Sequence, residues 1–284
     1  MKYLQLMLIV IITPLLFSMD WPSSSGLMRR NFGWNNEGLP HLGVSFDADE
    51  AIMAVENGEL LYRRLEEDTA SRLPSPLGTW TALDHGDGII SIYSRFEGKF
   101  TPSLPEYVEK GRLLGESGIS GWSSRKGFYF QLFDRKERRW INPAMIINPP
   151  QDSGTPVILS VRLRDSGGRI LELGQERTIN QGNYAILVET ARIIQGRNPL
   201  APFRIICSVN GIETGGLVFE TYSARDGVLM VYRNGLVPVR QVYSPYPAYE
   251  LGTAVFARGQ VTFEIIAQDA EGNSRNAVFR FTVE

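Results

Sequence analysis

Gln260-Val-Thr-Phe-Glu-Ile-Ile-Ala267 and Ala277-Val-Phe-Arg-Phe-Thr-Val283 flank the polar stretch Asp269-Ala-Glu-Gly-Asn273 near the end of the chain. Successive side chains of a strand point to opposite faces of a sheet, so alternating apolar and polar residues suit a half-buried strand. Gly, Asn and Asp between two such runs are typical of a turn. The sequence therefore predicts a β-hairpin over 260–283.

The residues before this hairpin continue the same pattern. Short apolar runs separated by turn residues occur at 157–163, 170–173, 184–188, 203–209, 217–222 and 228–232. About eight short strands with regular turns indicate a β-sandwich. The phrase at 267–273 before a last strand also resembles the closing hairpin of many extracellular immunoglobulin-like modules. We expect residues 155–284 to form an immunoglobulin-like β-sandwich, and we find no catalytic group of residues in it.

The first half also predicts strands, at 60–62, 80–83, 89–93 and 128–132, and helical periodicity is weak except at 104–109. The two halves are separated by Pro149-Pro150 and the polar residues 151–155, which are typical of a linker. The predicted organisation is all-β, with one domain over 28–148 and a second over 155–284.

Composition limits the functions that are open to the chain. Its 284 residues include 29 Lys and Arg against 31 Asp and Glu, for a net charge of -2. This balance argues against nucleic-acid binding, which needs a basic face. The single cysteine, Cys207, excludes an intrachain disulfide, and its place in the 203–209 run predicts a buried side chain. With only His41 and His85, a site of three or four imidazoles is excluded.

The N-terminal residues predict export. Lys2 precedes 15 uncharged residues, 3–17, which is shorter than the roughly 20 that span a bilayer. We interpret 1–18 as a signal peptide. Because Leu16 stands where a small residue is preferred for cleavage, an uncleaved anchor is the alternative, and it would be the only contact with a membrane. The expected location is extracytoplasmic.

Six stretches of the first half stand out by their order. They are Asn31-Phe-Gly-Trp34, Pro40-His-Leu-Gly-Val44, Ala54-Val-Glu-Asn-Gly-Glu-Leu60, Asp84-His-Gly-Asp-Gly88 with Ile92-Tyr-Ser-Arg-Phe96, Val108-Glu-Lys-Gly-Arg-Leu-Leu-Gly-Glu-Ser-Gly118, and Phe130-Gln-Leu132 with Asn142-Pro143. In this order they resemble lysostaphin/LytM-type zinc endopeptidases, over nearly all of 29–148. The resemblance implies a small two-sheet β domain with a narrow groove, in a family that cleaves peptide cross-bridges of bacterial peptidoglycan, and it implies a location in the periplasm or cell envelope of a bacterium.

The positions that this resemblance assigns to catalysis are nearly all altered. The family's first zinc motif is His-x-Gly-x-Asp, and here it reads His41 to Ser45. The family's His-x-His motif aligns with Gly127 to Tyr129. A further family histidine, two residues after a conserved tyrosine, aligns with Arg95, whereas the tyrosine is kept as Tyr93.

These replacements remove what zinc chemistry needs. A catalytic zinc takes three protein ligands and an open water position, and of the aligned ligand positions His41, Ser45 and Tyr129 only the first keeps its family residue. A guanidinium at Arg95 repels a cation, and Gly127 offers no general base. We predict no metal, no cofactor and no catalytic residue. A metal site rebuilt from His41, Asp47 and His85 is not favoured.

Three sets of residues are candidates for binding in the groove. Tyr93, Arg95 and Tyr129 are the candidate substrate-binding residues. Arg125 and Lys126 beside Arg95 would make the groove cationic and attract carboxylates or phosphates, although scattered surface charge explains them equally well. The tryptophans could stack on sugar rings, although packing is their commoner role; they are Trp34, Trp80 and Trp122.

Three functional hypotheses follow. The chain is a non-catalytic LytM-like envelope protein that binds peptidoglycan or regulates a cell-wall hydrolase. Alternatively, it is an active zinc metalloendopeptidase that cleaves peptidoglycan cross-bridges, which the two-histidine count opposes. In a further alternative, both domains are structural parts of an envelope assembly. We favour the first, so that the predicted partners are peptidoglycan or a wall hydrolase.

Overall fold

The computed structural model describes residues 19–23, 27–47, 49–65, 74–98, 102–148, 154–193 and 199–284. Over these residues the fold is all-β, as predicted, and its helical elements are two 3-10 turns, η1 (Pro143–Met145) and η2 (Val239–Gln241). Among the described residues, no helix is long and apolar enough to cross a membrane. The predicted signal peptide at 1–18 and most of the predicted linker lie outside the described residues.

An 11-stranded sheet contains most of the first half of the chain. Its main path runs β21-β20-β19-β12-β11-β8-β7-β6-β9, and β4 joins it by pairing with β11 and β1. The strands are β1 (Leu27–Arg30), β4 (Val44–Asp47), β6 (Gly58–Arg64), β7 (Trp80–Asp84), β8 (Ile89–Ser94), β9 (Tyr107–Val108), β11 (Phe128–Asp134), β12 (Arg139–Ile141), β19 (Thr221–Arg225), β20 (Val228–Tyr232) and β21 (Leu236–Pro238).

The small pair β5 (Ala51–Met53) and β10 (Leu113–Glu116) lies beside this sheet. Side chains of both layers form one buried cluster that includes Phe46, Ile52, Leu114 and Phe130. Residues 104–109, whose spacing resembled a helix, contain no helix: Tyr107 and Val108 form the short edge strand β9, which pairs with β6.

The second half forms two further sheets. One has four strands, namely β14 (Ile170–Glu172), β13 (Thr155–Arg164), β16 (Gly182–Ile193) and β22 (Tyr249–Phe256). The other has five, namely β15 (Thr178–Ile179), β24 (Ser274–Val283), β23 (Gly259–Gln268), β17 (Arg204–Val209) and β18 (Ile212–Val218). The predicted hairpin is β23 and β24, which pair antiparallel along their whole length.

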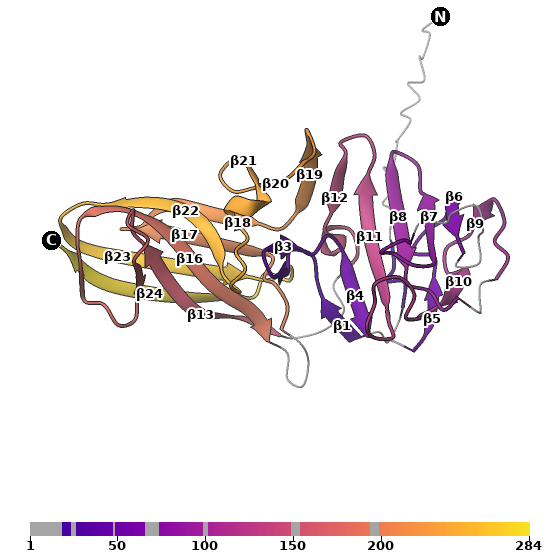
Figure 1. Ribbon diagram of the computed structural model, residues 1–284, viewed down its shortest axis with the longest axis horizontal. Coiled ribbons are helices and arrows are strands. Elements are labelled where there is room, and N and C mark those ends of the chain that lie inside the picture. The colour runs from indigo at the N-terminus through magenta and orange to yellow at the C-terminus, as the bar shows by residue number, and fades with distance from the viewer. Residues whose placement is uncertain are drawn as a thin grey trace, which may run out of the picture.

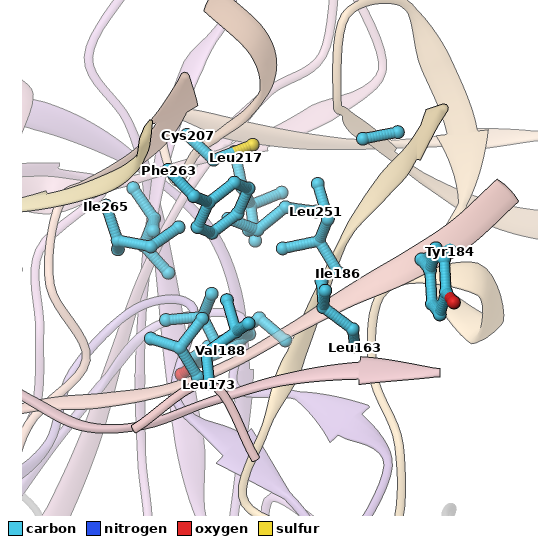
Figure 2. Close-up of a cluster of buried hydrophobic side chains, with 14 of the residues drawn as sticks. Leu163, Leu173, Tyr184, Ile186, Val188, Cys207, Leu217, Leu251, Phe263 and Ile265 are labelled. Carbon is cyan, nitrogen blue, oxygen red and sulfur yellow. The ribbon is translucent and has the colours of Figure 1, made fainter. Parts of the chain in front are cut away.

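The core of the second half lies between these two sheets. β23 buries every second side chain from Val261 to Ala267, the alternation that one covered face requires. Figure 2 shows Phe263 and Ile265 near Cys207, opposite Ile186 and other apolar side chains of the four-stranded sheet. Burying each large side chain stabilises the fold by about 1.5–3 kcal/mol. Cys207 is fully buried, so this prediction is confirmed.

The strand predicted over 217–222 is wrong, because two strands share this apolar run. β18 ends at Val218, and β19 begins at Thr221 in a different sheet. Asn142 redirects the chain between them, since its Nδ2 donates to the Phe219 carbonyl (2.7 Å) and its backbone N–H donates to the Glu220 carbonyl (2.8 Å). β19 then pairs with β12, so the hairpins β19–β21 extend the first sheet (Figure 1).

A second junction uses residues 31–40, which include the pair β2 (Asn35–Asn36) and β3 (Leu39–Pro40). Asn31 exchanges two hydrogen bonds with the backbone of Ala201, at 2.9 and 2.7 Å. The hydroxyls of Tyr243 and Tyr249 donate to the Gly33 carbonyl, at 2.8 and 3.2 Å. The two halves, which lie end to end in Figure 1, are therefore joined both by sheet pairing and by buried hydrogen bonds.

Candidate functional site

The three positions aligned with zinc ligands lie together. His41 precedes β4, Ser45 is in β4, and Tyr129 is the direct partner of Ser45 across the β4–β11 ladder. His41 Nε2 is 2.9 Å from Ser45 Oγ, and the rings of His41 and Tyr129 have centroids 4.9 Å apart. The fold therefore brings together residues that are 88 positions apart in the sequence, as the resemblance implies.

Close backbone contact beside β11 fixes this arrangement. A Cβ added at Gly43 would lie 2.3 Å from the Phe130 carbonyl oxygen, so only glycine fits there. Gln131 Nε2 donates to the Leu42 carbonyl at 3.3 Å. The chain after His41 is thus held against β11, which keeps the imidazole over the Tyr129 ring.

Arg95 also lies over the Tyr129 ring. Its guanidinium carbon lies 5.2 Å from the centre of the Tyr129 ring, a cation–π distance. The Arg95 backbone has a φ of 70°, which is rare for a residue with a side chain. Its N–H donates to the Leu77 carbonyl (2.9 Å), and its own carbonyl accepts from Gly118 (2.8 Å). Two loops therefore hold an unfavourable backbone conformation that aims Arg95 at the site.

Arginines surround a pocket of about 420 Å³ at this place. Arg30 reaches it because β1 pairs with β4 with Arg30 opposite Ser45. None of the described residues that line the pocket is acidic. Its lining is Arg29, Arg30, Trp34, Arg95, Trp122, Ser123, Ser124, Arg125 and, from the second half of the chain, Pro199.

The electrostatics of the site disfavour any added positive charge. The pKa of His41 is lowered to about 3, first because the imidazole is removed from water and then because Arg30, Arg95 and Arg29 lie nearby. Burial also raises the pKa of the Tyr129 phenol. Near neutral pH, His41 is therefore an uncharged imidazole and Tyr129 an uncharged phenol.

A zinc ion does not fit this set of donors. Ser45 and Tyr129 offer neutral hydroxyls where zinc prefers carboxylate and imidazole, and the phenolate of Tyr129 is disfavoured by burial. The His41 nitrogen that would face a metal already contacts Ser45. Across the described residues, no group of three His, Cys, Asp or Glu side chains could hold a metal.

The His41–Ser45 contact is not a nucleophilic pair either. A serine nucleophile needs a base that accepts its proton, and the resulting imidazolium needs an anionic partner. Here the charges that act on His41 are all arginines. Ser45 is also only 1% exposed, so a substrate has no access to its hydroxyl.

Gly127 cannot carry the histidine that the family places at its aligned position. It is buried, and its Cβ would lie 2.1 Å from the Phe46 carbonyl oxygen of the neighbouring strand. Any side chain at this position requires the backbone to move. The pairing of β11 with β4 therefore leaves no room for a general base at this position.

Tyr93 is not available to a ligand in the pocket. It is completely buried, and its hydroxyl accepts from the Val55 N–H (2.9 Å) and from the hydroxyl of Ser91 (3.0 Å). The Ser91 hydroxyl also forms a hydrogen bond with His85 Nε2 (2.7 Å), and His85 Nδ1 forms one with the Asn57 carbonyl (2.7 Å). Both nitrogens of His85 are therefore used in a structural network at the β7–β8 hairpin.

Of the remaining candidate binding residues, some line the pocket and others do not. Trp34 and Trp122 line the pocket, and Trp122 is 76% exposed. Trp80 instead packs against Tyr62, with ring centroids 4.8 Å apart. Lys126 forms an ion pair with Asp49. Of the two predicted cations, Arg125 and Lys126, it is Arg125 that lines the pocket.

The comparisons with known proteins give the following matches. A family model matches residues 155–284, and no curated protein matches the chain. Among solved structures, the chain is similar to the catalytic domain of the prophage-encoded M23 protein EnpA from Enterococcus faecalis, with 20% identity, a TM-score of 0.34, and coverage of 42% of this chain and 87% of that one.

Two further solved structures extend this picture. Lysostaphin from Staphylococcus simulans is 16% identical, with a TM-score of 0.33 and coverage of 72% of this chain and 82% of that one. A zinc-containing peptidase from Vibrio cholerae is also 16% identical, with a TM-score of 0.37, over 47% of this chain and 41% of its own, less than half its length. At these identities, the chemistry of this chain has to be decided from its own side chains.

Proposed function

We propose that the chain is a non-catalytic LytM-like protein of the bacterial cell envelope that binds peptidoglycan or regulates a cell-wall hydrolase. The resemblance of 29–148 supports the envelope role, and the signal peptide expected at 1–18 supports an extracytoplasmic location. One observation carries the non-catalytic part. The aligned ligand positions form a neutral cluster in which His41 contacts Ser45 and packs against the Tyr129 ring.

Hydrolysis fails in this cluster for three independent reasons. The metal lacks ligands, as two of the three positions carry hydroxyls. The position of a general base is occupied by Gly127, where the neighbouring strand leaves no room for a side chain. The guanidinium of Arg95 stands where the family has a histidine, and it lies over the Tyr129 ring. Restoring any one group leaves the other two losses in place.

The test combines metal content, hydrolysis and binding on the purified protein. We expect less than stoichiometric zinc after incubation with the metal and dialysis, no release of soluble muropeptides from sacculi, and sedimentation of the protein with intact sacculi. Stoichiometric zinc together with chelator-sensitive muropeptide release would establish an active zinc endopeptidase instead. Failure to sediment with sacculi would favour a structural component of an envelope assembly.

A single reversion separates a degenerate site from a misassigned one. Ser45→Asp restores the family's carboxylate, and we expect the variant to remain inactive on sacculi because the other two losses are untouched. Measurable release of muropeptides by this variant, beyond that of the unmodified protein, would show that the remaining residues are sufficient for hydrolysis.

A further inference from the structure

We infer that the arginine pocket formed by Arg29, Arg30, Arg95 and Arg125 binds a carboxylate of a muropeptide, with the two tryptophans against its sugar. The inference rests on the proposed function and specifies the ligand of that same site. It reverses the role of the family's groove, because the groove here attracts an anion where the family holds a cation.

The charges of the pocket are mostly uncompensated. Arg29 pairs with Asp47 at 3.2 Å. Arg30, Arg95 and Arg125 make no ion pair with the described residues. The Nε atoms of Arg29 and Arg95 are buried without a hydrogen-bond partner. Because three of the four guanidinium groups around the pocket have no acidic partner among the described residues, an oxyanion that enters it gains charge-assisted hydrogen bonds.

The pocket is also held in place before any ligand binds. Arg95 is fixed by its backbone contacts and by the Tyr129 ring beneath it. The backbone of Arg30 is fixed by strand pairing opposite Ser45. A pre-ordered guanidinium loses little side-chain entropy on binding, and two parallel N–H donors match the two oxygens of a carboxylate.

Size and lining favour a ligand larger than a free ion. A volume of about 420 Å³ lies within the range of pockets for small organic ligands. Trp122 is mostly exposed at the edge of the pocket, and Trp34 lines it. Tryptophan faces pack on the apolar face of a sugar ring, so they complement a fragment that carries both sugar and carboxylate, as a muropeptide does.

The experiment measures affinity by calorimetry on the full chain with three probes. These are a muropeptide with free stem-peptide carboxylates, the same muropeptide with its carboxylates amidated, and inorganic phosphate. We expect amidation to weaken binding at least ~10-fold, since charge-assisted hydrogen bonds are lost, and we expect affinity for the free form to fall with added salt. Inorganic phosphate should compete only weakly.

Variants locate the site. Arg95→Gln and Arg125→Gln should each weaken binding of the free muropeptide about 10-fold and remove most of the effect of amidation. Arg240→Gln, an exposed arginine in η2, is the matched control and should change nothing. Thermal unfolding of each variant checks that it folds. The amidation comparison uses the unmodified protein and therefore stands even where a variant does not fold.

The outcomes distinguish this inference from the proposed function. Binding to sacculi with no effect of amidation or of Arg95→Gln would overturn the pocket assignment and leave the proposed function standing. Tight phosphate binding without muropeptide binding would overturn the ligand class. Absence of binding to sacculi would remove the proposed function itself, and the inference with it.

Discussion

The charge state of His41 gives the sharpest test of the site. Its pKa is about 3 in the folded protein and about 6.5 in an unfolded chain. Between these values the unfolded chain binds a proton that the folded protein does not, so stability contributed by neutral His41 is present above pH 6.5 and is lost as pH falls below it. Each pH unit below 6.5 lowers the free energy of unfolding by about 1.4 kcal/mol, so the loss at pH 5 is about 2 kcal/mol.

Urea unfolding at pH 7 and pH 5 measures this loss. The unmodified protein and His41→Gln share every other titrating group, so the difference between their pH dependences isolates His41. We expect the unmodified protein to lose about 2 kcal/mol more than the variant between the two pH values. His85→Gln should keep the His41 dependence and thus identifies which histidine is responsible.

Proton NMR provides a direct check, because the chain has only two histidines. The imidazole signal that disappears in His41→Gln should not titrate between pH 8 and pH 5. A midpoint near 6.5 for that signal, together with equal pH dependence in the two proteins, would show that the imidazole is solvated. That result would refute the burial of His41 among the arginines, and with it the electrostatic account of the site.

Three further predictions test the fold around the site. Asn31→Ala should lower the free energy of unfolding by about 2 kcal/mol in urea titrations, because two buried backbone groups of Ala201 lose their partners; Asn36→Ala, at an exposed position, should change it by less than about 0.5 kcal/mol. Cys207, whose thiol pKa is raised to about 11 by burial, should react with a thiol reagent only after unfolding, and prompt reaction of the native protein would contradict its burial. Gly127→His should lower the thermal unfolding temperature by several degrees, and a variant as stable as the unmodified protein would show that the strand can shift to admit a side chain.

Local pattern predicted those strands whose partners are near in the sequence. The 260–283 hairpin is visible because one face is buried against the other sheet, which imposes alternation on β23. The run 217–222 misled because Phe219 and Tyr222 are both buried, and periodicity does not show that the chain changes sheets between them. That change depends on Asn142, whose side chain acts 77 residues away. Such long-range hydrogen bonds leave no local signal.

In the candidate site, too, sequence found some residues and missed those that only long-range strand pairing brings in. Alignment to the family motifs found His41, Ser45 and Tyr129, which the structure brings together. It missed Arg29 and Arg30, since only the pairing of β1 with β4 places them at the pocket, and the adjacent arginines of the sequence are otherwise an ordinary charged pair. Tyr93 was matched by type, but sequence could not show that its hydroxyl is used up inside the core.

Electrostatics connects the hydroxyl at position 45 with the arginines around the pocket. At an effective dielectric constant of about 20, a unit charge and a divalent ion about 6 Å apart interact by about 5 kcal/mol. The guanidinium carbon of Arg95 lies 5.2 Å from the centre of the Tyr129 ring, and Arg30 is paired opposite Ser45. Each arginine would therefore repel a metal ion bound between Ser45 and Tyr129. A carboxylate at the same distance is stabilised by about half that amount from each arginine, because it carries one charge instead of two. Under the proposed function, the arginines disfavour a cation in this groove, so hydrolysis requires the arginines to be removed as well as the ligands restored.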